Sequence, residues 1–236
     1  MTTSSTVKEQ LQKYYDENHI IPDGRFACAM LGRCPGDFAR GMQCHVGSRY
    51  GERTRIMVAA MDCGYGGKNT IDERTEKVVS NAQKGVINPH MRWTFKALSL
   101  FLDEEDPKEL VHYMIMTNTC KCCHKNDSKH MAPMYYYNCG MHTRAEVSII
   151  KPEVILFQGQ LASTGCQEYL EKIEGLEDEE IRSCLRILRM DGFSSFAVIC
   201  IHPSAYGRNM ARKIRFYDRI LPKVAKYIRE NINQLQ

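Results

Sequence analysis

Four short apolar runs limit what this chain can fold into more than any other feature. They read RIMVAAM (55–61), HYMIMTN (112–118), EVILFQG (153–159) and FAVICIH (196–202). Their apolar residues are nearly continuous rather than alternating, which is typical of parallel strands buried on both faces. Helical patterns lie between and after them, at roughly 91–103, 140–150, 160–172, 178–190 and 209–233. This alternation predicts an α/β fold, a three-layer αβα sandwich with a central four-stranded parallel sheet.

The length and composition suit one domain. With 236 residues and 43% hydrophobic content, we expect a single domain over residues 1–236. Residues 22–54 are rich in glycine, arginine and cysteine without a clear period, and we expect them to form an arm within that domain. Neither a long apolar run nor a signal-peptide pattern occurs, so we expect a cytoplasmic protein without membrane contact. No feature indicates an obligate protein partner, so a monomer is expected.

Polar or reactive residues follow each of the four apolar runs. Asp62 follows the first run, Asn118 ends the second, a Gln-Gly-Gln sequence ends the third, and His202 ends the fourth. Each residue by itself is more typical of an ordinary turn or helix cap. Because the carboxyl ends of parallel strands meet at one edge of a sheet, where ligands bind, the four ends together predict a functional site.

A basic stretch follows the His-Pro-Ser sequence that begins at His202. Residues 208–229 carry eight lysines and arginines against one acid, Asp218. A solvated helix face explains such a stretch as well as a binding surface does. Its place beside the predicted site favours a surface that faces phosphates.

The eleven cysteines indicate a metal rather than disulfides. Their number is odd and no export signal occurs, so a disulfide framework is not expected. Seven of them gather in two short regions of the chain: Cys28, Cys34, Cys44, Cys120, Cys122, Cys123 and Cys139. Clustered thiols suit an iron–sulfur cluster, and a zinc site that also uses His45, His124 or His142 is the alternative.

Four segments resemble the uracil-DNA glycosylase superfamily, in the same order along the chain. They are VAAMDCGYGG (58–67), MTNTCKC (116–122), IIKPEVILFQGQLA (149–162) and IHPSAYGR (201–208). The second and third are similar to the iron–sulfur branch, often called family four. The resemblance covers roughly residues 28–230.

The resemblance implies an enzyme, a monofunctional DNA glycosylase. It would hydrolyse the N-glycosidic bond of a pyrimidine rotated out of the DNA stack and leave an abasic site. Asp62 would orient the attacking water, His202 would stabilise the departing base, and Asn118 would read the base edge. The other residues assigned to the base pocket are Gly64, Tyr65, His90 and Trp93. Those assigned to the DNA backbone or the gap are Ser204, Tyr206, Arg208, Arg212 and Lys213.

The resemblance also implies a [4Fe–4S] cluster. Its expected ligands are Cys34, Cys44, Cys122 and Cys139, with Cys28, Cys120 and Cys123 as rivals. Because residues 22–54 have little core of their own, we expect the metal to fasten this arm to the domain.

Departures from the family pattern leave the target base open. Cys63 stands where the first motif has proline, and Gly64 stands where the uracil-specific branch has tyrosine. The expected stacking phenylalanine is absent. Uracil and a C5-modified cytosine, as in phage DNA, are therefore both candidates, and the second would indicate antiviral defence. The alternative is a metal-stapled DNA-binding module with the same fold and no activity.

Overall fold

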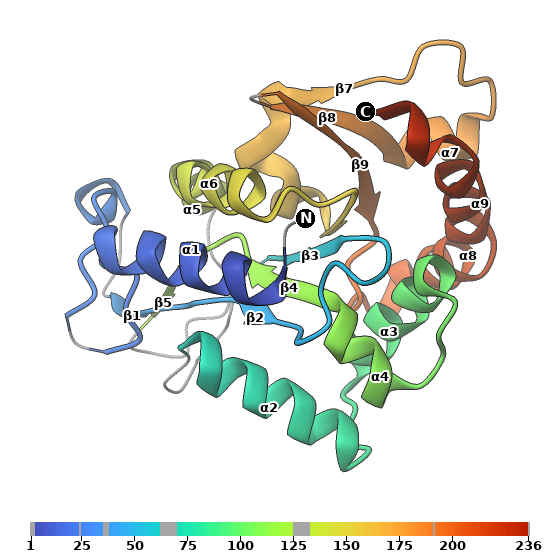
Figure 1. The fold of residues 1–236 in the computed structure, drawn as a ribbon. Helices are drawn as coiled ribbons and strands as arrows, with labels where there is room; N and C mark the ends of the chain where they lie inside the picture. The colour runs from blue at the N-terminus through green and yellow to red at the C-terminus, as the bar shows by residue number, and fades with distance from the viewer. Residues whose placement is uncertain are drawn as a thin grey trace.

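A computed structural model describes residues 3–23, 25–34, 38–61, 70–124, 133–190 and 192–235. Its main sheet has seven strands among these residues, in the order β2-β4-β3-β6-β9-β8-β7 (Figure 1). The four central strands β4 (Met114–Asn118), β3 (Ile56–Ala60), β6 (Val154–Gln158) and β9 (Phe193–Cys200) are mutually parallel. They correspond to the four apolar runs.

The three outer strands of the main sheet are antiparallel to their neighbours. They are β2 (His45–Val46) beside β4, β8 (Leu185–Met190) beside β9, and β7 (Leu170–Glu171) beside β8. A separate two-stranded sheet pairs β1 (Phe38–Gly41) with β5 (Cys122–His124). The α/β class is thus confirmed, and the sheet is mixed and larger than the four strands expected.

Helices cover both faces of the central strands, and this explains the continuous apolar runs. In β3, Ile56 and Val58 point into one core while Met57 and Ala59 point into the other. The first core packs against α3 (Pro89–Leu102), α4 (Pro107–Tyr113) and the C-terminal helices. The second packs against α1 (Ser4–Glu17) and α6 (Gly140–Ile150). Because both faces of these strands are covered, their middle residues are mostly apolar, and the polar residues lie chiefly toward the strand ends.

The expected helix over 178–190 is wrong in its second half. Residues Glu179–Cys184 form α7, but Leu185–Met190 form β8, which pairs in register with β9 from Leu185↔Val198 to Met190↔Phe193. The apolar spacing of this segment suits a helix. The unpaired edge of β9 offers a ladder of backbone hydrogen bonds, and this tertiary contact overrides the local pattern.

A helix occupies part of a region whose sequence reads as irregular. Residues Ile71–Gln83 form α2, which begins at a capping box. Thr70 accepts a hydrogen bond from the Glu73 backbone N–H, and the Glu73 side chain accepts one from Thr70 in return. The Thr-x-x-Glu spacing is the sequence signal for this helix.

A separate cysteine-rich arm over residues 22–54 is not confirmed. Its later half belongs to the main body of the protein, because Cys44, Val46 and Tyr50 are buried in the second core and β2 extends the main sheet. The strand β1 instead lies against β5, close to the second group of cysteines.

The C-terminal helical segment changes its geometry just before Pro222. It consists of α8 (Met210–Arg215), a π-helical turn (Phe216–Ile220) and α9 (Leu221–Asn231). Proline lacks the N–H that a continuous helix would need, and it lies in the first turn of α9, where none is required. In Figure 1 these helices lie beside α3 at one side of the molecule. Within the described ranges, every helix is too short or too polar to span a membrane.

Candidate functional site

The carboxyl ends of β3, β4, β6 and β9 meet at one side of the sheet, which we call the carboxyl edge. Ala60 pairs with Asn118, and Gln158 pairs with Cys200, so these ends are level with one another. Gly159 adopts a φ of 107°, and a Cβ atom there would lie 2.8 Å from Met61 Sδ and 3.5 Å from His202 Cδ2. A glycine is required at this point because three strand ends converge on it.

His202 is held in a defined orientation just beyond β9. The Ser204 backbone N–H donates to its Nδ1 at 3.2 Å, so a neutral ring carries its proton on Nε2. The His90 ring lies 5.5 Å away, between centroids. Burial, with contributions from His202 and Arg74, lowers the pKa of His90 to about 4. His90 is therefore neutral at neutral pH, and His202 presents a hydrogen-bond donor at the carboxyl edge.

Lys213 supports the turn that carries His202. Its side chain is 1% exposed, and its Nζ donates to the Pro203 carbonyl at 2.9 Å. The same Nζ lies 5.2 Å from the Trp93 ring centroid and 5.3 Å from that of Tyr206. This placement does not fit the phosphate contact expected of Lys213. Trp93, expected to stack on a base, packs against Lys213 and Tyr217.

The segment that follows this turn carries several exposed apolar side chains. Tyr206 is 62% exposed, and Met210 and Ile214 are exposed on α8. Arg212 is also exposed and Ser204 is half-buried, whereas the side chain of Arg208 lies outside the described residues. Met210 and Ile214 are four residues apart and therefore lie on the same face of α8.

Part of the basic stretch is neutralised by acids of α7. Glu180 pairs with Arg215, Arg219 and Lys223, and Asp178 also pairs with Lys223. These contacts lower the pKa of Glu180 to about 2, chiefly through the Lys223 and Arg215 hydrogen bonds. The basic face is therefore less free to meet phosphates than the sequence suggests.

Asn118 contacts a residue that the sequence did not single out. It is 5% exposed, and its Oδ1 accepts a hydrogen bond of 2.6 Å from Arg74 Nη2. Arg74 projects from α2 and also donates to the Gln43 carbonyl at 2.7 Å. No local pattern distinguishes Arg74 from the exposed charged residues of α2, so only the fold reveals it.

Gln158 is a second buried amide at the carboxyl edge. It is 1% exposed, and its Nε2 donates to Thr94 Oγ1 at 2.7 Å. Its Oε1 has no hydrogen-bond partner among the described residues. A buried acceptor of this kind is costly unless a water or ligand meets it.

Three thiols form a compact group next to this edge. The Sγ atoms of Cys120, Cys122 and Cys139 lie within 4.8 Å of one another, and all three residues are buried. Hydrogen bonds from the other two thiols lower the pKa of Cys139, and hydrogen bonding and burial raise the pKa of Cys120. Negative charge therefore gathers on Cys139, and the group can hold a metal ion.

Two half-buried thiols of the N-terminal segment lie near this group. Cys34 packs against the apolar cluster that contains Cys120, and Asn138 Nδ2 lies 3.2 Å from its Sγ. Cys28 Sγ lies 3.3 Å from Nε2 of His142, whose Nδ1 lies 2.7 Å from Tyr14 Oη.

Cys44 lies apart from the thiol group, although it was expected to be a ligand. It is fully buried in the second core, and burial raises its pKa to about 12. His45 is also apart, because its Nε2 is bonded to the Val111 carbonyl. Cys123 is buried on β5 outside the group, and the His124 side chain lies outside the described residues.

A buried ion pair lies directly behind the thiols. Lys121 Nζ lies 2.6 Å from both carboxylate oxygens of Glu146, and the two side chains are 1% and 0% exposed. Thr117 and Tyr15 donate further hydrogen bonds to the carboxylate. Lys121 stands between two of the thiols in sequence, and Glu146 belongs to α6, which begins next to Cys139. The pair thus ties together the segments that supply all three thiols.

Three predicted site residues, Asp62, Gly64 and Tyr65, lie outside the described residues. Comparison with known proteins adds no further assignment. No protein-family model matches the chain, and a search of curated proteins finds no match. The glycosylase roles therefore remain predictions from the sequence motifs.

Proposed function

We propose that this chain is a monofunctional DNA glycosylase that removes a flipped pyrimidine, either uracil or a C5-modified cytosine. The observation that carries the proposal is the His202 ring, fixed by the Ser204 amide with Nε2 as its donor. Asn118 lies three strand positions away along the same edge, because β6 and β3 stand between β9 and β4. At the strand spacing of about 4.8 Å this separation is roughly 14 Å, which one base and its two flanking side chains can fill.

In the proposed reaction, water attacks the sugar C1′ atom and the C1′–N1 bond breaks. The bonding electron pair leaves with the base, and His202 Nε2–H donates a hydrogen bond to the base O2 as negative charge develops there. Asp62 orients the water and accepts its proton. No lysine stands where a Schiff base would form, so the product is an abasic site without strand cleavage.

The surface beyond His202 supports DNA as the partner. Tyr206, Met210 and Ile214 are exposed apolar groups that can enter the gap left by a flipped nucleotide, and Arg212 lies among them. Binding through Arg212 and Arg208 would weaken as salt rises. Removal of a modified cytosine would suit defence against phage, and removal of uracil would suit repair.

We further propose that the thiol group is a metal centre, with Cys34 as fourth ligand beside Cys120, Cys122 and Cys139. Four thiolates fit a [4Fe–4S] cluster or a structural zinc ion. The metal would fasten the segment around Cys34 to α5 (Pro133–Asn138) and α6. A brown protein with a thiolate–iron absorbance band supports the cluster, and a colourless protein with one zinc per chain supports zinc.

The activity is tested on duplexes that contain uracil, 5-hydroxymethylcytosine or its glucosylated form. After incubation, alkali cleaves any abasic site and breaks the strand. We expect breaks at one or more of these bases, and His202→Ala should slow them by about a hundredfold or more. His112→Ala, at the opposite end of β4, is the matched control and should keep the wild-type rate.

The alternative function is a DNA-binding module without activity. Tight, salt-sensitive binding to duplexes with no strand breaks on any substrate would establish that reading and reject the enzyme.

A further inference from the structure

Gln158 carries a buried hydrogen-bond acceptor that the proposed reaction does not use. It ends β6 and is 1% exposed, and its Nε2 donates to Thr94 Oγ1 at 2.7 Å. Its Oε1 has no hydrogen-bond partner within the described ranges. A buried amide oxygen without a donor lowers stability, so a donor from a water molecule or a ligand would stabilise it. Gln158 is therefore a candidate contact for a bound base.

The orientation of the Gln158 amide follows from its contact with Thr94. The Thr94 hydroxyl donates its only proton to the His90 carbonyl at 3.1 Å, so its oxygen can only accept from Gln158. The amide nitrogen must therefore face Thr94, and Oε1 points away from it. Because one end of the amide is fixed in this way, the acceptor is in place before any ligand binds.

Gln158 and Asn118 point to the same face of the sheet. Leu156 and Met116 precede them by two residues in β6 and β4, and both belong to the first core. Side chains two residues apart in a strand lie on one face, so both amides lie on the side of α2 and α3, which supply their partners. Between them β3 ends at Ala60, which is level with both and adds only a methyl group to this face.

His202 lies on the other side of Gln158. The strand that leads to it, β9, is level with β6, because Gln158 pairs with Cys200. The His202 ring also meets α3, where the His90 ring lies 5.5 Å away between centroids. The acceptor of Gln158 thus belongs to the strand between the residue expected at the base O2 and the residue expected at the opposite edge of the base. A base that reaches from His202 toward Asn118 lies against Gln158.

We infer that Gln158 is a specificity-determining residue whose Oε1 accepts a hydrogen bond from an N–H group of the flipped base. This inference rests on the proposed glycosylase function. Uracil offers its ring N3–H group, and a C5-modified cytosine offers its exocyclic amino group. A base without an N–H group would leave the acceptor buried and unpaired, which is how a polar site rejects a ligand of nearly the same shape.

Gln158 is enclosed by its neighbours, so a base reaches Oε1 only if a side chain beside it moves. His90 lies one turn before Thr94 on α3, and its side chain is partly exposed. We expect the His90 ring to give way as the base enters.

Bases with and without an N–H group test the inference. Pyrimidin-2-one keeps the ring and the O2 atom of uracil and cytosine but has no N–H group. Single-turnover excision is measured for uracil, 5-hydroxymethylcytosine and pyrimidin-2-one in the same duplex. Gln158→Met should slow whichever of the first two the wild type removes by about tenfold or more, because the N–H group loses its acceptor. It should change the rate for pyrimidin-2-one by about twofold or less, because that base has no N–H group to lose a partner.

Binding gives the same comparison where excision is too slow to follow. A fluorine at the sugar 2′ position destabilises the cationic sugar and blocks cleavage, so the affinity for each base can be measured on an intact duplex. Gln158→Met should weaken binding of the N–H base and leave that of pyrimidin-2-one unchanged. The base that shows the loss identifies the donor, which is N3–H for uracil and the amino group for 5-hydroxymethylcytosine.

Two further variants separate recognition from folding. Thr94→Val keeps the shape of the side chain but removes the hydroxyl that orients the amide. It should show the same selective loss to a smaller degree, so it can be read if Gln158→Met folds poorly. Gln167→Met makes the same change at an exposed glutamine in the segment after β6 (Gln160–Tyr169), and it should leave all rates unchanged.

The outcomes distinguish the two proposals. A wild-type protein that excises no base rejects the glycosylase function and this inference with it. If the wild type is active but Gln158→Met and Thr94→Val affect all three bases equally, or affect none, the inference is overturned and the glycosylase function stands. Gln158 would then serve the fold alone.

Discussion

The thiol group and the histidine turn lie at the same edge of one sheet but have opposite electrostatic character. The thiol group (Cys120, Cys122, Cys139) gathers negative charge, and the lysine behind it is fully matched by Glu146. The histidine turn (His202–Ser204) and its surroundings contain two buried cations, Arg74 and Lys213, which donate hydrogen bonds to neutral acceptors. The first arrangement suits a bound cation, and the second suits a ligand that carries or develops negative charge.

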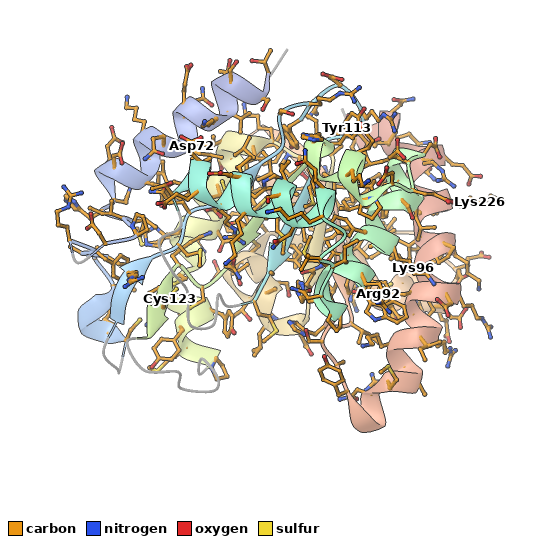
Figure 2. All side chains as sticks on the ribbon, turned by 90° about the horizontal axis from the view of Figure 1, so that it is seen from below. Asp72, Arg92, Lys96, Tyr113, Cys123 and Lys226 are labelled. Atoms are coloured by element: carbon orange, nitrogen blue, oxygen red, sulfur yellow. The ribbon has the colours of Figure 1, made fainter. Side chains whose placement is uncertain are left out.

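The two regions also differ in their access to solvent. The thiols are buried, and a small sheet of β1 and β5 lies over that end of the molecule, where Cys123 is labelled in Figure 2. The histidine turn leads into exposed apolar residues near α3, whose Arg92 and Lys96 are labelled toward the opposite side of the same view. A closed site suits a structural metal, whereas an open one suits a ligand that enters and leaves.

The largest expected effect comes from removing a thiol. Cys139→Ser should weaken zinc or iron binding by about a hundredfold or more, because a buried three-thiol group loses its most acidic member. Metal content after dialysis against a chelator measures it. Cys166→Ser removes a thiol that is equally buried but outside the group, and it should leave the metal content intact. Equal metal loss in both variants would mean that the group is only a part of the core.

The next effect comes from breaking the ion pair behind the thiols. Glu146→Leu leaves Lys121 buried without its carboxylate, which should lower the free energy of unfolding by about 3–5 kcal/mol. Urea denaturation measures the loss. The double variant Lys121→Met/Glu146→Leu should regain most of it, because no unpaired charge remains. A single variant as stable as the double one would contradict the structural role of the pair.

A smaller effect is expected at the histidine turn. Lys213→Met removes one charged hydrogen bond to Pro203 and the contact with two aromatic rings, which should cost about 1–3 kcal/mol of unfolding free energy. Arg212→Met, on the neighbouring exposed residue, should change stability by about 0.5 kcal/mol or less. If the two variants were equally stable, Lys213 would not be what holds the turn.

The smallest effect near neutral pH concerns two buried histidines, His90 beside the histidine turn and His45 in the core. Burial lowers the pKa of both His90 and His45 to about 4. As pH falls below about 6.5, these two histidines bind protons in the unfolded chain before they do so in the native protein. The free energy of unfolding therefore declines from about pH 6.5 toward pH 4. Each histidine contributes a slope of up to about 1.4 kcal/mol per pH unit. His90→Gln should reduce the slope of unfolding free energy against pH, and an unchanged slope would show that folding does not lower the pKa of His90.

The sequence predicts much of the framework because its signals are local. The four continuous apolar runs identify the parallel strands. The Thr-x-x-Glu spacing at Thr70 is a capping-box signal that indicates the start of α2. The strand β8 is harder, since its apolar spacing suits a helix and only the open edge of β9 makes it a strand. Lys213 is equally hard to predict. Its sequence neighbours suggest a surface cation, but the fold buries it between α3 and the histidine turn.

The order of residues along the chain is enough to predict that polar and thiol-bearing residues gather at one edge, because they follow strands whose carboxyl ends meet there. Which of these residues come into contact depends on the packing of the whole fold. It brought Cys120 to Cys122 and Cys139 and buried Cys44 elsewhere, and it placed Arg74 of α2 on Asn118 of β4. The hydrogen bond from Arg74 to Asn118 joins residues 44 apart in the chain, and the one from the Lys121 backbone N–H to Cys139 Sγ joins residues 18 apart. Hydrophobic periodicity records which face of an element is buried, but it does not record which partner that face will meet.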